Sequence, residues 1–347
     1  MRVVGRQFLY PDGSNFDWRG ITAFSLVEQL ARGRDIDVDA YLGWCAANGV
    51  SLVRVLAMCA TWLTLTPKEG LTFLPRLLLM AEQYGLYVEV VGLAATSSYA
   101  VDVNKHLSDV AAVCKDHANA VLEGANEPYH STQQGTVEAT VDAFAPPAPV
   151  VYCPGAGRTD EGTLSHTGGH FLNVHNDRKA GENGWRWSRH VKDSGDASRH
   201  YKMPLNADEA MGAGEQDTSS RDSNPAHFLA FAANCKINSI GSTFHYSDGL
   251  LTTIPTGKQL ECFHAWRQGL DVVPSGGQFQ NSGWNTGPVD SADWTHVLRI
   301  YHSLFGNRGY SLFIGLTGPP NPVWINGWHP VKLLASLPGV EVHEIGK

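Results

Sequence analysis

The sequence predicts an α/β protein built on a (β/α)8 barrel, with a small C-terminal antiparallel β appendage. Short apolar segments alternate with amphipathic helical segments from residue 20 onward, which is typical of a parallel sheet with crossover helices. Eight such units fit between residues 20 and 268, and this number and length match the barrel. A doubly wound sheet is the alternative, but no Gly-rich phosphate loop follows the first strand.

Residues 1–19 precede the barrel and are expected to form a β-hairpin cap. Residues 7–18 read as two short strands around the turn Pro11-Asp12-Gly13. We expect this cap to close the bottom of the barrel, where its strands begin.

The barrel is expected to repeat strand and helix from residue 20 to residue 268. Gly49 and Gly85 mark the ends of two helices, because glycine readily takes the left-handed conformation that ends a helix. The segment after the fifth strand is rich in glycine and weak in helix signals. The expected strands are 20–26, 51–58, 86–93, 120–125, 150–152, 171–175, 204–207 and 239–245. The expected helices are 39–48, 74–84, 105–117, 136–144, 187–201, 225–235 and 259–268.

Residues 270–347 differ in character from the barrel. Turn residues such as Gly276-Gly277 and Gly318-Pro319-Pro320 separate alternating runs such as 297–301 and 310–314. We expect a β-rich C-terminal subdomain, and a structural buttress is favoured over a carbohydrate-binding module.

Composition and charge limit the partners of the protein. The net charge is −8 and no block of Lys or Arg stands out, so no nucleic-acid partner is expected. No apolar stretch approaches about 18 residues, so no membrane span is expected. Nothing in the sequence indicates an oligomeric state.

The six cysteines are scattered, without a CxxC pair, and are expected to be free thiols rather than a disulfide framework. The start, residues 1–6, lacks the long apolar region of a signal peptide. Both observations favour a cytoplasmic or phage-encoded protein, the alternative being a secreted protein whose signal has been removed.

Two acids lie where predicted strands four and seven end. Glu127 stands in Asn126-Glu127-Pro128, and Glu209 closes the segment 203–209. The catalytic face of such a barrel lies at the carboxyl ends of its strands. Two carboxylates there can divide the acid and nucleophile roles of glycoside hydrolysis.

Two other acids compete with Glu209 for the nucleophile role. Asp208 is its neighbour on a strand and is therefore expected to point to the opposite side. Glu215 lies beyond two glycines, in a predicted loop. Glu209 is accordingly the favoured nucleophile.

The motif Asn126-Glu127-Pro128 on strand four, together with Glu209 on strand seven, resembles the signature of glycoside hydrolase clan A. Glu123, four residues before Glu127, fits the same signature. Trp18-Arg19-Gly20-Ile21 resembles the barrel entry of this clan, and Val53-Arg54-Val55 resembles the position of its active-site arginine. Cellulase-like family 5 enzymes are the nearest match, over about residues 1–265.

This resemblance implies a retaining O-glycosyl hydrolase that cleaves a β-glycosidic bond by double displacement and needs no cofactor. Glu127 would be the general acid and then the general base, with a raised pKa. Glu209 would be the nucleophile, and Arg54 would keep it ionised and aligned. Asn126 would donate to the 2-hydroxyl of the sugar, and His175 would help to set the acid/base. Glu123 is expected to be structural, deeper in the barrel and paired with an arginine.

The substrate is expected to be an oligo- or polysaccharide. His245, Tyr246 and Asp248 stand at the end of strand eight, where family 5 enzymes usually carry Trp. Strand three ends in Ala94-Ala95-Thr96, where these enzymes carry His. These departures put a cellulase-like substrate in doubt. The substrate-binding residues are expected to be Arg54, Asn126, His175, His245, Tyr246, Asp248, Trp62 and Trp185.

Two other functions remain open at this point. A metal-dependent barrel hydrolase could use His175, Asp177, His245 and Asp248 as ligands. Against it, no HxH motif follows strand one, where residues 22–24 stand. A catalytically inactive sugar-binding barrel is the second alternative, and the intact pair of acids argues against it.

Overall fold

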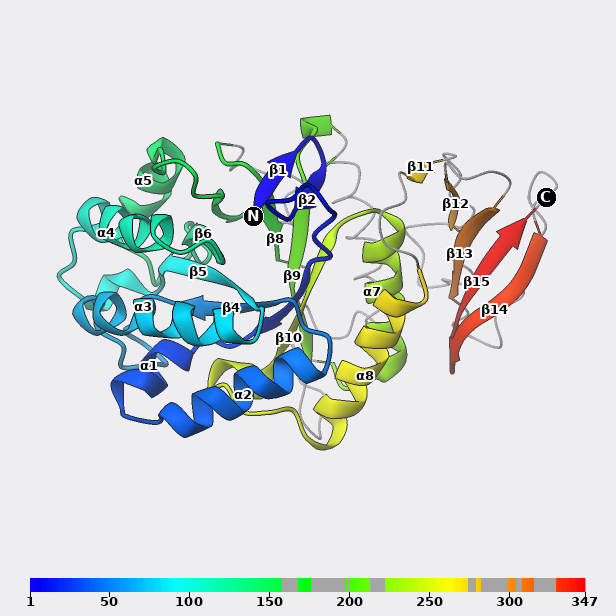
Figure 1. Cartoon of the computed structure of the whole chain (residues 1–347), viewed down its shortest axis with the longest axis horizontal. Coiled ribbons are helices and arrows are strands. Elements are labelled where there is room, and N and C mark those ends of the chain that lie inside the picture. Colours follow the sequence, from blue (N-terminus) through cyan, green and yellow to red (C-terminus); the bar gives the residue numbers. More distant parts are fainter. Residues whose placement is uncertain are drawn as a thin grey trace.

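A computed structural model confirms the (β/α)8 barrel with a C-terminal β appendage (Figure 1). The barrel closes in the order β10-β3-β4-β5-β6-β7-β8-β9, and all of its neighbouring strands are parallel. The structure describes residues 1–157, 168–175, 198, 200–212, 222–273, 279–281, 299–303, 308–314 and 329–346. The barrel strands are β3 (Arg19–Thr22), β4 (Leu52–Leu56), β5 (Tyr87–Leu93), β6 (Ala120–Ala125), β7 (Tyr152–Gly157), β8 (Leu172–Val174), β9 (Leu205–Gly212) and β10 (Gly241–Tyr246).

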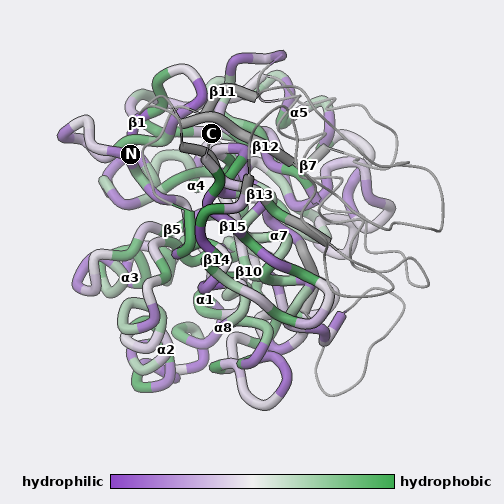
Figure 2. Tube along the Cα trace, turned by 90° about the vertical axis from the view of Figure 1, so that its right-hand side faces the viewer, coloured by the Kyte–Doolittle hydropathy of each residue, from purple (hydrophilic) through white to green (hydrophobic). Residues whose placement is uncertain are grey.

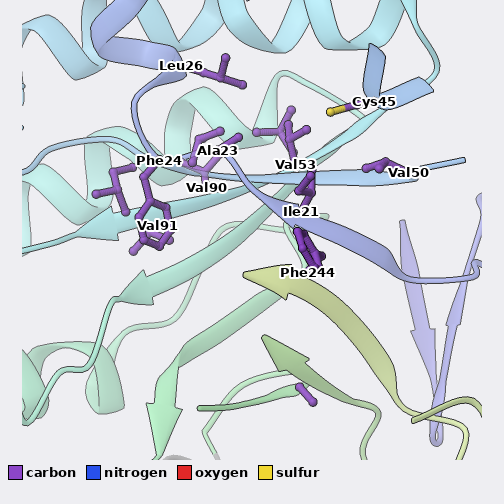
Figure 3. Close-up of a cluster of buried hydrophobic side chains, with 14 of the residues drawn as sticks. Ile21, Ala23, Phe24, Leu26, Cys45, Val50, Val53, Val90, Val91 and Phe244 are labelled. Atoms are coloured by element: carbon purple, nitrogen blue, oxygen red, sulfur yellow. The ribbon is translucent and has the colours of Figure 1, made fainter. Parts of the chain in front are cut away.

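Alternate residues of each strand face the two sides of the barrel wall. Ile21 pairs in register with Val53 on one side and Phe244 on the other, and all three belong to the apolar core between the strands and the helices (Figure 3). Arg54 and His245, each one residue further along its strand, face the interior of the barrel instead. The interior is therefore polar where the outer layer is apolar.

The helices surround the barrel, and several of them begin earlier than expected. Thr66 and Glu69 form a reciprocal capping box and Pro67 takes the first helical position, so α3 starts seven residues before the expected 74. The first strand ends at Thr22 rather than Leu26, because Leu26 begins a short helix. The described helices are α1 (Leu26–Ala31), α2 (Asp35–Ala47), α3 (Pro67–Gln83), α4 (Val103–Lys115), α5 (Val137–Ala143), α7 (Pro225–Ile237) and α8 (Gly257–Asp271), with 3-10 turns η1 (Thr96–Ser98) and η3 (Ser247–Leu250).

Other expectations fall partly outside the described residues. Of the helix expected at 187–201, residues 198, 200 and 201 are described, and they are helical. All six cysteines are buried and free, as expected. None of the helices in the described ranges is long and apolar enough to cross a membrane.

The N-terminal segment forms a hairpin before the expected turn as well as the expected turn itself. β1 (Arg2–Val4) pairs with β2 (Gln7–Leu9), so the chain reverses at Gly5, which has the positive φ of +56° that favours glycine. The segment 11–13 makes a separate turn, bounded by a single bridge between Leu9 and Asn15. The expected turn at 11–13 is therefore present, and the hairpin of β1 and β2 is an additional one that precedes it.

The N-terminal segment closes the end of the barrel where the strands begin. Phe8, Phe16 and Trp18 are buried there, and the rings of Phe8 and Trp18 lie 4.6 Å apart. Their cluster includes Leu52 and Tyr87, the first residues of β4 and β5. The apolar side chains of this segment thus cover the bottom of the barrel.

The C-terminal strands form one antiparallel sheet in the order β11-β12-β13-β15-β14. Leu312, Val340 and Val342 join the main apolar core, and β13 and β15 contact α7 (Figure 2). This packing is what a structural buttress requires. The strands are β11 (Phe279–Asn281), β12 (Arg299–Ser303), β13 (Arg308–Ile314), β14 (His329–Leu337) and β15 (Val340–Gly346).

Candidate active site

The two predicted acids meet at the carboxyl ends of β6 and β9. Glu127 follows the end of β6 at Ala125, and Glu209 lies in the second half of β9. The structure brings one carboxylate oxygen of each acid and one nitrogen of His175 within 4.8 Å of one another. Glu127 has a φ of +46°, a left-handed conformation that costs energy for a residue with a side chain. The chain therefore holds Glu127 in a strained position opposite Glu209.

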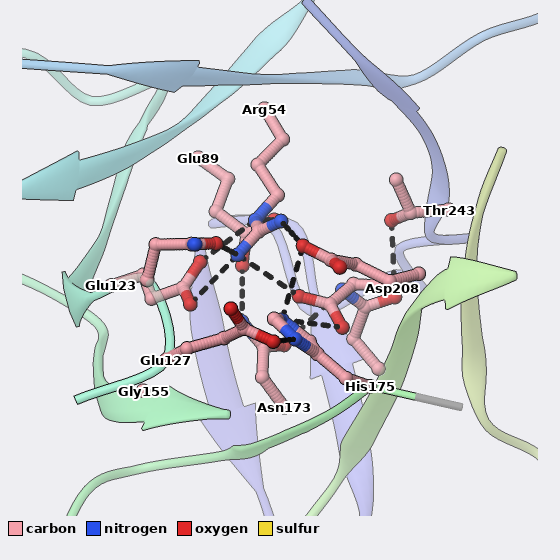
Figure 4. Close-up of polar contacts among 12 residues, drawn as sticks. Arg54, Glu89, Glu123, Glu127, Gly155, Asn173, His175, Asp208 and Thr243 are labelled. Atoms are coloured by element: carbon pink, nitrogen blue, oxygen red, sulfur yellow. Dashed lines mark hydrogen bonds and ion pairs between the residues drawn. The ribbon is translucent and has the colours of Figure 1, made fainter. Parts of the chain in front are cut away.

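Arg54, on β4, connects acids of two other strands, β6 and β9 (Figure 4). Its Nε and Nη2 donate to the two oxygens of Glu123 at 2.8 and 2.9 Å, and its Nη1 donates to Oε1 of Glu209 at 2.9 Å. Burial lowers the pKa of Arg54, but the charges of Glu123, Asp208 and Glu209 outweigh burial and raise it well above its ordinary value. The guanidinium is therefore a permanent positive charge beside Glu209. The expected pairing of Glu123 with an arginine is confirmed.

The side-chain amide of Asn126 is oriented by the same arginine. Nη2 of Arg54 donates to Oδ1 of Asn126 at 3.1 Å. Because the carbonyl oxygen takes this bond, the amide nitrogen is the end turned away from Arg54. Asn126 is half-buried, next to Glu127, so this nitrogen is a donor beside the acid.

His175 follows β8 and lies between the two acids. Its Nδ1 is 3.2 Å from Oε1 of Glu127, and its Nε2 is 3.2 Å from Oε1 of Glu209. Burial lowers the pKa of His175, but the charges of Glu209 and Asp208 outweigh burial and raise it to about 10. The ring is therefore an imidazolium at neutral pH.

Asp208 also faces the barrel interior, contrary to expectation. Between the β9–β10 pairs Ala207–Ser242 and Ala210–Phe244, two residues of β9 stand opposite the single Thr243. Such a β-bulge breaks the alternation of side chains. Oδ2 of Asp208 lies 3.3 Å from Nη2 of Arg54, and its Oδ1 lies 3.6 Å from Nε2 of His175.

A chain of polar side chains lies beneath these groups and ends at Glu89. Asn173 donates to Oε1 of Glu89 at 2.8 Å and in turn accepts from Asn206 at 3.2 Å. Asn206 accepts from Thr243, which accepts from the indole of Trp18 at the bottom of the barrel. Sequence reasoning missed Glu89, although an acid inside the apolar run 86–93 is a usable signal.

Glu89 lies near several other acids and is fully buried. Burial and the charges of Glu123 and Asp208 raise its pKa well above the ordinary value, while Arg54 opposes the shift. Its Oε2 has no hydrogen-bond partner among the described residues and lies 3.9 Å from Nε of Arg54. The neutral form of Glu89 is therefore favoured, and Arg54 forms its hydrogen-bonded ion pairs with Glu123 and Glu209 instead.

Of the residues predicted on strand eight, the structure places only His245 in the barrel interior. His245 is buried, with Nδ1 2.6 Å from Oγ1 of Thr22. Tyr246 faces the helices, where its hydroxyl lies 2.9 Å from that of Tyr41 and donates to the carbonyl of Thr253 at 2.7 Å. Alternation along β10 therefore separates Tyr246 from the acids. Asp248 lies in η3 and is exposed.

Trp62 lies in the loop after β4 and is 43% exposed. Its ring packs 5.5 Å from that of Phe24, which lies 5.8 Å from the ring of His245 and also covers the guanidinium of Arg54. Trp62 therefore presents an open aromatic face near the predicted site. Trp185, Asp177 and Glu215 lie outside the described residues.

The described residues do not assemble the predicted metal ligands. Two groups of side chains have ligand atoms close enough together to hold a metal ion, and neither group contains His245 or Asp248. The first group is Glu123, His175 and Asp208, and the second is Glu127, His175 and Glu209. In the first group Arg54 already supplies the cation, bonded to Glu123 and 3.3 Å from Asp208. The arrangement fits acid–base chemistry better than a metal centre.

Comparison with known proteins supports the fold. No family profile and no curated protein sequence matches the chain. A β-glucanase from Saccharophagus degradans, solved in complex with cellotetraose, matches with a TM-score of 0.58 and 12% identity over 77% of this chain and 91% of that one. A putative glycoside hydrolase from Bacteroides vulgatus matches with a TM-score of 0.62 and 15% identity over 95% of this chain and 69% of that one.

A third solved structure, a GH5_18 protein from Bifidobacterium longum subsp. infantis, matches with a TM-score of 0.54 and 12% identity over 75% of this chain and 80% of that one. At such identities the likeness shows the fold alone. The chain has the cellulase-like barrel fold of clan A glycoside hydrolases.

Proposed function

We propose that this protein is a retaining glycoside hydrolase that cleaves a β-glycosidic bond by double displacement. The observation that carries the proposal is the approach of Glu127 and Glu209 to within 4.8 Å, oxygen to oxygen, at the carboxyl ends of β6 and β9. The fold shared with several glycoside hydrolases supports it.

Each acid has a separate task in the first step. Glu209 is the nucleophile, since the bond from Arg54 favours its ionised form. It attacks the anomeric carbon while Glu127 gives its proton to the leaving oxygen, so that an ester bond forms and the glycosidic bond breaks. In the second step Glu127 takes a proton from water, and the hydroxide formed displaces Glu209 from the sugar.

The short separation supports retention of configuration. Retaining enzymes hold the two carboxyl groups about 5–5.5 Å apart, while inverting enzymes need about 6.5–9.5 Å to admit a water molecule. One oxygen of Glu127 lies within 4.8 Å of one oxygen of Glu209, a separation that a retaining pair requires. Direct attack by a carboxylate is therefore favoured over attack by water in the first step.

Substrate contacts come from the residues around the pair. The amide nitrogen of Asn126 is proposed to donate to the 2-hydroxyl of the sugar, a contact that strengthens in the transition state. The exposed ring of Trp62 offers an apolar face on which a sugar ring can stack. We propose an oligo- or polysaccharide substrate and no cofactor.

The first experiment is a screen of the protein against aryl β-glycosides and β-linked polysaccharides. Glu127→Gln and Glu209→Gln are then each expected to lower kcat on the best substrate by about 10³-fold or more, with an unchanged melting temperature. Glu82→Gln, at an exposed position of α3, is the matched control and should keep full activity. EDTA should leave activity unchanged. Full activity of Glu209→Gln would overturn the assignment, and no turnover of any glycoside would overturn the function.

A further inference from the structure

The β-bulge in β9 brings a third acid next to the proposed catalytic pair. Asp208 is fully buried, and neither of its oxygens has a hydrogen-bond partner among the described residues. Its nearest cationic groups among the described residues are Arg54 at 3.3 Å and His175 at 3.6 Å. A buried carboxylate is costly unless it is paired, so these two groups compensate its charge.

We propose that Asp208 is a positioning residue that keeps His175 protonated while Glu209 is bonded to the sugar. The inference rests on the proposed function of Glu127 and Glu209. It concerns the second step of that reaction, which the pair alone does not explain.

The geometry around His175 gives the reason. In the free enzyme, Nε2 of His175 faces two anions, Glu209 at 3.2 Å and Asp208 at 3.6 Å. Formation of the ester neutralises Glu209, because its charge is consumed in the bond to the sugar. Asp208 is then the close anion that remains on this side of the ring. Glu123 also favours the imidazolium from deeper in the barrel, but its charge is engaged by the two bonds from Arg54.

The charge of His175 matters because Nδ1 faces Glu127 at 3.2 Å. Before the first step, the negative charge of Glu209 favours protonated Glu127, the form that donates to the leaving oxygen. After the first step, Glu209 no longer carries its negative charge. The imidazolium then favours ionised Glu127, the form that accepts a proton from water. A His175 that lost its proton at this stage would no longer favour ionised Glu127, so less of the enzyme would carry the ionised base and the second step depends on Asp208.

The kinetic test is Asp208→Asn, assayed with a dinitrophenyl glycoside of the best sugar from the screen. Attack on such an activated substrate is fast, so kcat reports the second step and kcat/KM the first. We expect kcat to fall by about tenfold or more, with kcat/KM changed less than about threefold, and a glycosyl-enzyme to accumulate as a burst and in the intact mass. Asp17→Asn, the same exchange at a half-buried carboxyl that pairs with Arg19 at the bottom of the barrel, is the control and should change neither constant.

The second readout is the titration of His175 by NMR, assigned from the signal lost in His175→Gln. We expect its pKa to fall from about 10 by about one to three pH units in Asp208→Asn. An unchanged titration, or an active variant with unchanged kcat, overturns the role of Asp208 and leaves the proposed function standing. A wild-type protein that turns over no glycoside overturns the proposed function itself. Asp208→Ser replaces the asparagine variant if that variant does not fold.

Discussion

Nη1 of Arg54 donates a 2.9 Å hydrogen bond to Oε1 of Glu209, and this bond crosses the interior of the barrel from β4 to β9. The side chains are 0% and 4% exposed, so little solvent screens the interaction. The same guanidinium binds Glu123 through two further nitrogens. One planar group thus sets the position of the proposed nucleophile relative to β6, the strand that leads to Glu127.

Arg54→Lys is expected to impair both stability and activity. A lysine cannot reproduce the fork of three bonds, so buried acids lose their partner. We expect the free energy of unfolding to fall by about 3 kcal/mol and kcat by about 10²-fold, measured by denaturant unfolding and by assay on the best glycoside. Arg76→Lys, at an arginine that pairs with Asp35 on the surface, should stay within about 0.5 kcal/mol of wild type. Equal behaviour of the two variants would contradict the role of Arg54.

The raised pKa of His175 predicts a loss of stability at alkaline pH. The pKa is about 10 in the folded protein against an ordinary value of 6.5, so both states are protonated below about pH 6.5 and only the folded state is protonated between the two values. The stabilisation is therefore complete below pH 6.5 and lost as pH rises towards 10. Unfolding measured over this range should show a declining stability that His175→Gln flattens.

His106 is the matched control, because it is a buried histidine with the opposite shift. Burial lowers its pKa to about 4, so the unfolded state binds the additional proton between pH 4 and 6.5. The stability associated with neutral His106 is present above pH 6.5 and is lost as pH falls towards 4. His106→Gln should therefore change the pH dependence of the unfolding free energy only below pH 6.5 and leave the alkaline decline as it is in wild type. An alkaline limb that is the same in wild type and His175→Gln would show that His175 is not an imidazolium at neutral pH.

Trp62→Ala is expected to weaken the binding of long substrates. Loss of one stacking platform should raise KM for an oligosaccharide by about tenfold and leave kcat little changed. Trp62→Phe keeps an aromatic face and should recover most of the affinity. Leu79→Ala removes another exposed apolar side chain, on α3, and should have no effect. An unchanged KM for Trp62→Ala on every oligosaccharide tested would exclude this surface as a subsite.

The barrel could be predicted because each strand is a short apolar segment between turn signals, and every expected barrel strand overlaps an observed one. The ends of helices were harder to place. The start of α3 depends on the reciprocal bonds of Thr66 and Glu69, and the apolar run from β3 continues into α1 at Leu26 without a change in composition. Composition alone therefore does not separate the last strand residue from the first helix residue.

At the site, Glu127 and Glu209 could be predicted to lie close together because each stands at or near the carboxyl end of a strand, whereas Arg54 and His175 were expected from the family resemblance. The inward position of Asp208 could not, because the bulge depends on how β9 pairs with β10, which local sequence does not report. The place of Tyr246 could have been found from alternation, since its neighbour His245 faces the barrel interior.

The most direct measurement is covalent trapping with a set of activated 2-deoxy-2-fluoro β-glycosides, which slow the second step more than the first. The protein should gain the mass of one fluoroglycosyl group, and peptide mapping should locate that group on Glu209. Glu127→Gln should still be labelled by a reagent whose leaving group needs no proton, and Glu209→Gln should not be. A label on Asp208 or another residue, or hydrolysis of the parent glycoside with inverted configuration, would contradict the proposed pair.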